Sequence, residues 1–111
     1  MFNNINLGFY NGHPEYRDQE ILGCKLVMTC GACPEQYDVF YKDQQIGYLR
    51  LRHGNFTADY PDVHGELVYQ ANPKGDGIFE DSEREIYLTS AVACLLVRHY
   101  FRVKVKENEQ D

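Results

Sequence analysis

The sequence predicts an α+β fold: an antiparallel β-meander of about five strands with one C-terminal helix packed on one face. Two features of the chain favour this fold class. Short runs of strand-like apolar pattern, separated by short polar turns, fill residues 21–71. A segment with apolar residues at helical spacing follows them. The 111 residues are enough for one domain with a modest core of its own.

The strands are expected within a single domain over residues 21–106, between an irregular N-terminal arm (1–20) and a polar tail (107–111). The arm is rich in Asn, Gly and charged residues and has no clear period. The predicted strands span residues 24–29, 36–42, 46–53, 56–60 and 66–71. Because a short turn joins each strand to the next, a meander is the simplest topology.

The last predicted element is a helix that begins near Ser82. Ser82 and Glu85 have the spacing of a capping box, in which the two side chains satisfy free backbone N–H groups. One apolar stripe follows at helical spacing: Leu88, Ala91, Val92, Leu95, Leu96 and His99. We expect His99 to be a hydrogen-bonded core histidine rather than a catalyst. Residues 101–106 alternate in the strand manner and favour a final edge strand.

The composition is that of a globular protein with an acidic surface. The net charge is −6, which disfavours binding to duplex DNA and to anionic membranes. The N-terminus lacks the pattern of a signal peptide, and no stretch reaches transmembrane length. We therefore expect a cytoplasmic protein whose cysteines stay reduced.

Cys30 and Cys33 form a C-x-x-C pair directly after an apolar run. Two thiols at this spacing can share a zinc ion, and His53 and His64, at predicted strand ends, are the expected further ligands. Other cysteines and histidines that could complete such a site are Cys24, Cys94, His13 and His99. Thiol redox chemistry is a further interpretation, but it needs a helix after the pair, and the residues that follow have a strand pattern. The remaining interpretation is a tight turn with partly buried thiols, which the residue types favour.

Residues 72–83 are similar to the twelve-residue calcium loop of EF-hands. Asn72, Asp76, Gly77 and Glu83 occur at loop positions 1, 5, 6 and 12. Lys74, however, occupies position 3, where an oxygen ligand is needed, and a predicted strand precedes the loop. We therefore expect a glycine-rich turn that leads into a capped helix, and not a calcium site.

Tyr48, Arg50 and Arg52 lie on one face of a predicted strand, and Leu49 and Leu51 lie on the other. Two guanidinium groups beside an aromatic ring are suited to a phosphate, a carboxylate or stacked bases. The small size and negative charge of the chain favour the acidic patch of a protein or a small anion over duplex DNA. The alternative is a solvated strand that binds no partner. Its arginines would then pair with cross-strand acids such as Asp38 or Asp59.

Three segments have distinctive sequences: residues 30–39 (CGACPEQYDV), 47–54 (GYLRLRHG) and 75–85 (GDGIFEDSERE). Together they resemble a family of small proteins from bacteria and their phages or prophages, over roughly residues 24–98. The resemblance implies no particular activity and transfers no catalytic residue. It implies a cytoplasmic role associated with mobile genetic elements.

The leading hypothesis is a small non-enzymatic binding or regulatory module that uses Tyr48, Arg50 and Arg52. Its expected partner is a protein or a small anion. The alternative is a zinc protein that uses Cys30 and Cys33, and a thiol redox protein is the third hypothesis. No nucleophile, base and orienting acid can be matched by spacing, and nothing in the sequence specifies an oligomeric state.

Overall fold

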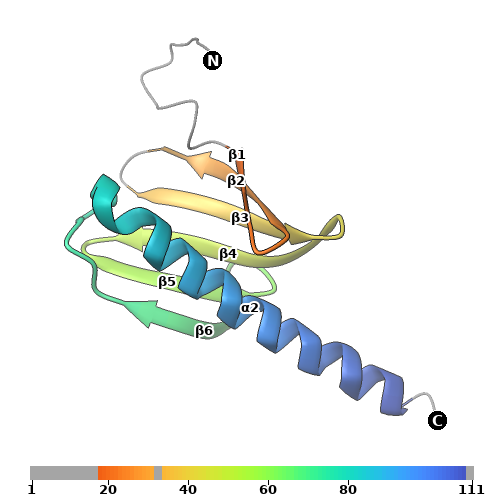
Figure 1. The fold of residues 1–111 in the computed structure, drawn as a ribbon. Coiled ribbons are helices and arrows are strands. Elements are labelled where there is room, and N and C mark those ends of the chain that lie inside the picture. Colours follow the sequence, from red (N-terminus) through yellow and green to blue (C-terminus); the bar gives the residue numbers. More distant parts are fainter. Residues whose placement is uncertain (1–17, 32–33, 110–111) are drawn as a thin grey trace.

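The computed structural model describes residues 18–31 and 34–109 and contains a six-stranded antiparallel sheet with one long helix on one face (Figure 1). The elements are β1 (Asp18–Ile21), β2 (Cys24–Cys30), β3 (Glu35–Tyr41), β4 (Gln44–Arg52), β5 (Asn55–Tyr60), β6 (Glu66–Ala71) and α2 (Asp81–Glu109). Strand order in the sheet equals strand order in the chain. The structure confirms the predicted α+β meander and adds a sixth strand to it.

The additional strand, β1, begins inside the segment that was expected to be irregular. It has four residues and pairs with β2 through Gln19 opposite Leu26 and Ile21 opposite Cys24. Asp18 and Glu20 are exposed, so the strand has too few apolar residues to show a pattern. Residues 1–17 of the predicted arm lie outside the described residues.

Three of the hairpins are closed by turns of two residues. In each turn both residues have positive φ, as in the type I′ turns that match the twist of paired strands. These pairs are Leu22 and Gly23, Lys42 and Asp43, and His53 and Gly54. The tight turns keep consecutive strands in register, so that alternate residues of the meander reach the same face.

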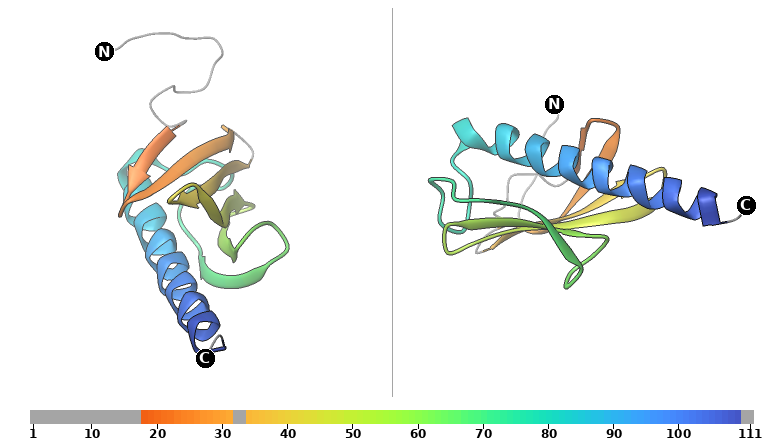
Figure 2. Two further views of the ribbon diagram at one scale, coloured as in Figure 1. Left: turned by 90° about the vertical axis from the view of Figure 1, so that its right-hand side faces the viewer. Right: turned by 90° about the horizontal axis from the view of Figure 1, so that it is seen from below.

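The hydrophobic core lies between α2 and one face of the sheet, as the right-hand view of Figure 2 shows. Fully buried members include Leu26, Leu49 and Phe56 from the strands and Leu88 and Leu95 from the helix. The predicted helical stripe is confirmed at its buried positions Leu88, Ala91, Val92 and Leu95. No described helix or strand covers the opposite face of the sheet, which we call the open face.

Gly47 allows α2 to come close to the sheet. A Cβ atom at this position would lie 2.3 Å from Cδ1 of Leu95. Because Leu95 is fully buried, its side chain has little space to move away. The absence of a side chain at residue 47 therefore sets how closely the two layers pack.

Helix α2 is longer than predicted, and the expected strand over residues 101–106 is wrong. The helix continues without interruption to Glu109, and its last turns extend beyond the sheet (Figure 1). Val103 and Val105 alternate with basic residues and so imitate a strand, but no Gly or Pro interrupts the helix before them. Residues 107–109 of the predicted polar tail are helical as well.

The predicted capping box is displaced by two residues. The Glu83 carboxylate, not that of Glu85, reaches back to the amide of Glu80, at 3.0 Å. The carbonyl of Glu80 accepts the first helical hydrogen bond, from the amide of Arg84 at 3.2 Å. Glu80 therefore occupies the position that Ser82 was expected to fill.

Candidate functional site

The open face carries two rows of side chains that cross the sheet. The first, which we call the arginine row, is defined by the pairing register and comprises Cys30, Gln36, Arg50, Thr57 and Gln70. The second, the aspartate row, comprises Asp18, Val27, Asp38, Tyr48, Asp59 and Leu67. Since Leu49 and Leu51 are fully buried, alternation along β4 directs Tyr48, Arg50 and Arg52 to the open face, as predicted.

Arg50 lies in the middle of the sheet between two uncharged residues. Its directly opposite neighbours are Gln36 on β3 and Thr57 on β5. Within residues 18–31 and 34–109, neither Arg50 nor Arg52 forms an ion pair with a carboxylate. Arg50 therefore presents a half-buried positive charge among neutral hydrogen-bonding groups.

The acids that were considered as partners of the arginines lie opposite Tyr48 instead. Asp38 faces Tyr48 from β3 and Asp59 faces it from β5. Burial raises the pKa of the Tyr48 phenol, and the two carboxylates raise it further, while Arg50 acts in the opposite direction. The Tyr48 hydroxyl donates a hydrogen bond to Oε1 of Gln36 and so joins the two rows.

Asp38, inside the aspartate row, accepts a hydrogen bond from a neighbouring glutamine. The Nε2 group of Gln45 donates to Oδ1 of Asp38 at 3.3 Å and to Oδ1 of Asp62 at 3.0 Å. Burial raises the pKa of the Asp38 carboxyl, and the charge of Asp62 adds to the effect. Asp38 and Asp59 thus flank Tyr48 from the two neighbouring strands, and Arg50 and Arg52 follow Tyr48 along β4.

Arg52 lies where the open face meets the loop that precedes α2. Arg52, Pro34, His53, Asp76 and Gly77 line a hollow of about 290 Å³. Two backbone hydrogen bonds hold its walls together, from Glu35 N to the Gly77 carbonyl (2.8 Å) and from Gly54 N to the Asp76 carbonyl (2.7 Å). The hollow lies at the end of the strand that carries Arg50.

The four predicted zinc ligands do not gather at one place. Cys30 ends β2 and His53 follows β4, at the same end of the sheet. His64 lies in the turn after β5, at the opposite end, about 20 Å away by the length of that strand. His53 and His64 therefore lie at opposite ends of the sheet, and only His53 lies at the end where β2 places Cys30. Cys33 lies outside the described residues, so zinc binding by the cysteine pair stays a prediction.

The other residues considered as zinc ligands are dispersed. Cys24 is fully buried at the far end of β2, where burial raises the pKa of its thiol. Cys94 belongs to α2, and His13 lies outside the described residues. Among residues 18–31 and 34–109, no group of three or more His, Cys, Asp and Glu side chains is arranged to hold a metal ion.

The element that follows the cysteine pair bears on the redox interpretation. After the pair the chain enters β3, and not the helix that a redox site needs.

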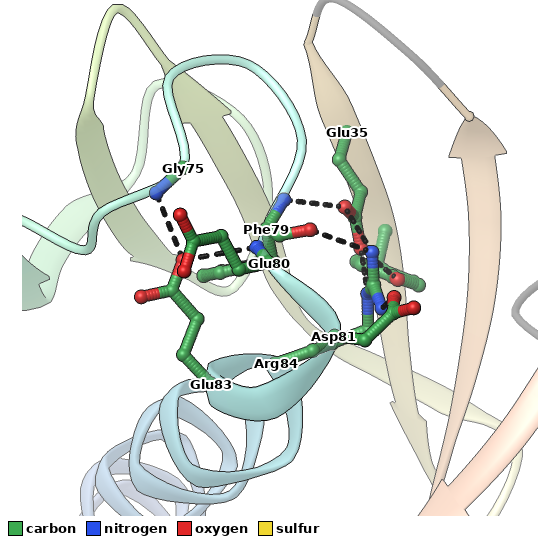
Figure 3. A network of polar contacts seen from close by, with 8 residues as sticks. Glu35, Gly75, Phe79, Glu80, Asp81, Glu83 and Arg84 are labelled. Carbon is green, nitrogen blue, oxygen red and sulfur yellow. Dashed lines mark hydrogen bonds and ion pairs between the residues drawn. The ribbon is translucent and has the colours of Figure 1, made fainter.

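Glu83, the last residue of the loop similar to an EF-hand, organises that loop through its carboxylate. The amides of Lys74 and Gly75 donate to the two Oε atoms at 2.9 and 2.8 Å, and the amide of Glu80 donates at 3.0 Å. Figure 3 shows the carboxylate between the loop and the first helical turn. Burial alone would raise the pKa of the Glu83 carboxyl, but these three hydrogen bonds outweigh it and the pKa is lowered. The loop is a turn that leads into a capped helix, as expected.

A buried polar network that the sequence did not reveal lies beside this loop (Figure 3). Arg84 donates from Nε to Oε2 of Glu35 at 2.9 Å and from Nη2 to the Phe79 carbonyl at 3.1 Å. The amide of Phe79 donates to Oε1 of Glu35 at 3.0 Å, and the hydroxyl of Tyr37 also donates to this carboxylate. Glu35 and Arg84 are 49 positions apart, and no local pattern marks either one. Each charge is matched, so the network joins sheet, loop and helix rather than offering a reactive group.

His99 makes the hydrogen bond expected of it. Its Nδ1 atom lies 2.7 Å from the hydroxyl of Tyr60. Burial lowers the pKa of His99, and the charge of Arg102 lowers it further. The guanidinium groups of Arg98 and Arg102 lie over the Tyr60 ring, and Arg98 pairs with Glu66 at 2.8 Å. His99 thus belongs to the contacts that hold the far half of α2 on the sheet.

The comparisons with other proteins give no relative from which a function could be transferred. No protein-family model, no curated protein and no solved structure matches the chain. In the part of the chain that the structure describes, no helix combines the length and the apolar character needed to cross a membrane.

Proposed function

We propose that this protein is a non-enzymatic binding module whose open face recognises an acidic segment of a partner protein. The arginine row supplies the contact, with Arg50 at its centre and Arg52 and Tyr48 beside it. The related expectations of a cytoplasmic location and of an association with phages or prophages belong to this proposal.

The position of Arg50 is the observation that supports the proposal most directly. Its guanidinium is flanked by Gln36 and Thr57, so no cross-strand carboxylate competes for it. A carboxylate that approaches the row would meet the guanidinium together with amide and hydroxyl groups that also form hydrogen bonds. Asp38 and Asp59 of the neighbouring aspartate row would repel an acidic segment placed across that row and so would restrict how the segment lies.

The recognition chemistry favours a protein segment over a nucleic acid. In the described part of the chain, Arg50 and Arg52 are the only arginines on the face, while the whole chain carries a net charge of −6. Duplex DNA binding draws on many phosphate contacts and is opposed by a negative overall charge. A short acidic segment needs only a local positive site.

An NMR titration with a glutamate-rich peptide tests the proposal. We expect amide shifts to concentrate on Gln36, Arg50, Thr57 and Gln70 and to diminish as salt is added. The double variant Arg50→Glu, Arg52→Glu should weaken the peptide affinity at least about tenfold, because the contact becomes repulsive.

The double variant Lys25→Glu, Lys42→Glu is the matched control. It changes the net charge by the same amount, and both lysines are exposed and lie away from the arginine row. It should leave most of the affinity in place. Equal losses in the two variants, or shifts scattered over the surface, would contradict a specific site at the arginine row.

A further inference from the structure

Helix α2 carries a second apolar stripe on the side that faces away from the sheet. The stripe, which we call the outer stripe, consists of Ile86, Ser90, Cys94, Val97, Phe101 and Val105. Steps of three and four residues place all six on one side of the helix. Ile86, Val97, Phe101 and Val105 are 67, 57, 57 and 53% exposed. The helix therefore has two separate apolar stripes, and only one of them contacts the sheet.

Nothing within the described chain covers the outer stripe. In the right-hand view of Figure 2 the helix lies above the sheet, and of the other described elements only the β1–β2 hairpin rises beside it. Residues 103–109 are all exposed, and these last turns extend past the sheet (Figure 1). A helical end without tertiary packing is marginal in water, so a partner that covers it would stabilise it.

The order of large and small residues makes the outer stripe complementary to itself. When two copies of α2 run antiparallel about a two-fold axis between residues 95 and 96, Ile86 faces Val105 of the second copy. Phe101 then faces Ser90, so that the largest side chain of the stripe meets the smallest. Cys94 faces Val97 at the centre. A two-fold axis makes every such contact occur twice.

We propose that the outer stripe is the interface of an antiparallel homodimer, in which α2 of one copy lies along α2 of the other. The helix has 29 residues and a length of about 43 Å, so the two helices overlap along nearly their whole length. The end of each helix that extends past its own sheet then lies against the anchored first half of its partner. The stripe contains no charged residue.

The available area is sufficient for a stable interface. With Ile86, Val97, Phe101 and Val105 between 53 and 67% exposed, the stripe offers on the order of 500 Å² of accessible surface in each copy. Two copies together would bury about 1,000 Å² of apolar surface, and the flanking polar atoms bring the total toward the roughly 1,200–2,000 Å² of specific interfaces.

Sedimentation of the full chain over a range of concentrations tests the dimer. The wild type should sediment as a dimer, and Phe101→Glu should raise the dimer dissociation constant at least about tenfold. The matched control is Leu67→Glu, because Leu67 is 52% exposed but belongs to the aspartate row on the open face. Circular dichroism should show both variants to be folded. A wild type that is monomeric at every concentration, or a dimer dissociated by Leu67→Glu and not by Phe101→Glu, would overturn the proposal.

A charge pair tests the antiparallel arrangement. Ile86 and Val105 are about 28 Å apart along one helix, so they can meet only across the interface. Ile86→Glu with Val105→Glu should dissociate the dimer, whereas Ile86→Glu with Val105→Lys should retain it. A parallel arrangement would put like charges together in both double variants. Loss of the dimer in both would therefore overturn the antiparallel pairing.

Discussion

At the scale of single residues, the ion pair of Glu35 and Arg84 is the buried polar contact on which the start of α2 depends. Glu35 is 1% exposed and Arg84 is 6% exposed, and both charges are matched by hydrogen bonds from sheet, loop and helix. The net contribution of such a pair is small when it is complete, because removing two charges from water is costly. The cost becomes large when only one partner is removed.

Arg84→Met should therefore lower the free energy of unfolding by about 3–5 kcal/mol, since the Glu35 carboxylate stays buried without its cation. Adding Glu35→Gln should recover part of this loss. Lys104→Ala is the control, because Lys104 and Glu107 form an exposed pair at 3.5 Å that should contribute less than about 0.5 kcal/mol. Urea unfolding measures all three. An Arg84→Met variant as stable as Lys104→Ala would be inconsistent with a buried pair.

The sequence identified single residues correctly where strand alternation decides their position. Tyr48, Arg50 and Arg52 lie on the predicted face because Leu49 and Leu51 must face the core. Strand alternation does not predict how far apart two turns lie in the folded sheet. His53 and His64 both follow strands, but consecutive antiparallel strands end at opposite edges of a sheet, so one of the two had to be far from Cys30. The partnership of Glu35 with Arg84 depends on tertiary packing, which local patterns do not contain.

At the scale of elements, the loop before α2 and the first helical turn depend on one carboxylate. Glu83 is ionised when it accepts hydrogen bonds from the amides of Lys74, Gly75 and Glu80. The fold therefore holds the pKa of this group below its ordinary value of 4.5. The resulting stability is complete above the pKa of the unfolded chain and is lost as the pH falls through the lower pKa of the folded protein.

Glu83→Gln should consequently be less stable than the wild type at neutral pH, and the difference should shrink as the pH falls below about 4.5. Thermal unfolding followed at several pH values measures the difference. Glu85→Gln, in the same helical turn, should differ little from the wild type at any pH, because Glu85 makes no hydrogen bond to the loop among the described residues. A constant difference between Glu83→Gln and the wild type at all pH values would argue against this role.

Most of the elements could be predicted because each depends on a local signal. Alternation and turn residues located five strands, and the helical stripe located α2. Strand β1 has no such signal, because half of its four residues are charged and exposed. At the end of α2 the local signal is misleading. Val103 and Val105 have a strand-like spacing, but they continue a helix that is already formed and has no residue to stop it.

At the scale of the whole molecule, the contact between the two layers depends on Gly47. A methyl group at this position would lie 2.3 Å from the Leu95 side chain, which is fully buried. The cost would be shared between a shift of α2 and a strained rotamer of Leu95, and overpacking of this kind typically costs about 1–3 kcal/mol.

Gly47→Ala should therefore destabilise the protein by about that amount. Combining it with Leu95→Ala should cost less than the sum of the two single changes, because the smaller side chain leaves space for the new methyl group. A double-mutant cycle by urea unfolding measures the coupling. Strict additivity would indicate that the two layers are not in contact at this point.

The order of the elements along the chain also determines when the core can close during protein synthesis. The six strands leave the ribosome before α2, and the tight hairpins can form as soon as each strand is complete. The apolar side of the sheet, however, has no cover until the last third of the chain has been made. Leu26 and Phe56, which are fully buried in the folded protein, have no helix to cover them until then. A chain interrupted before residue 81 would present that whole apolar side to chaperones and to other nascent chains.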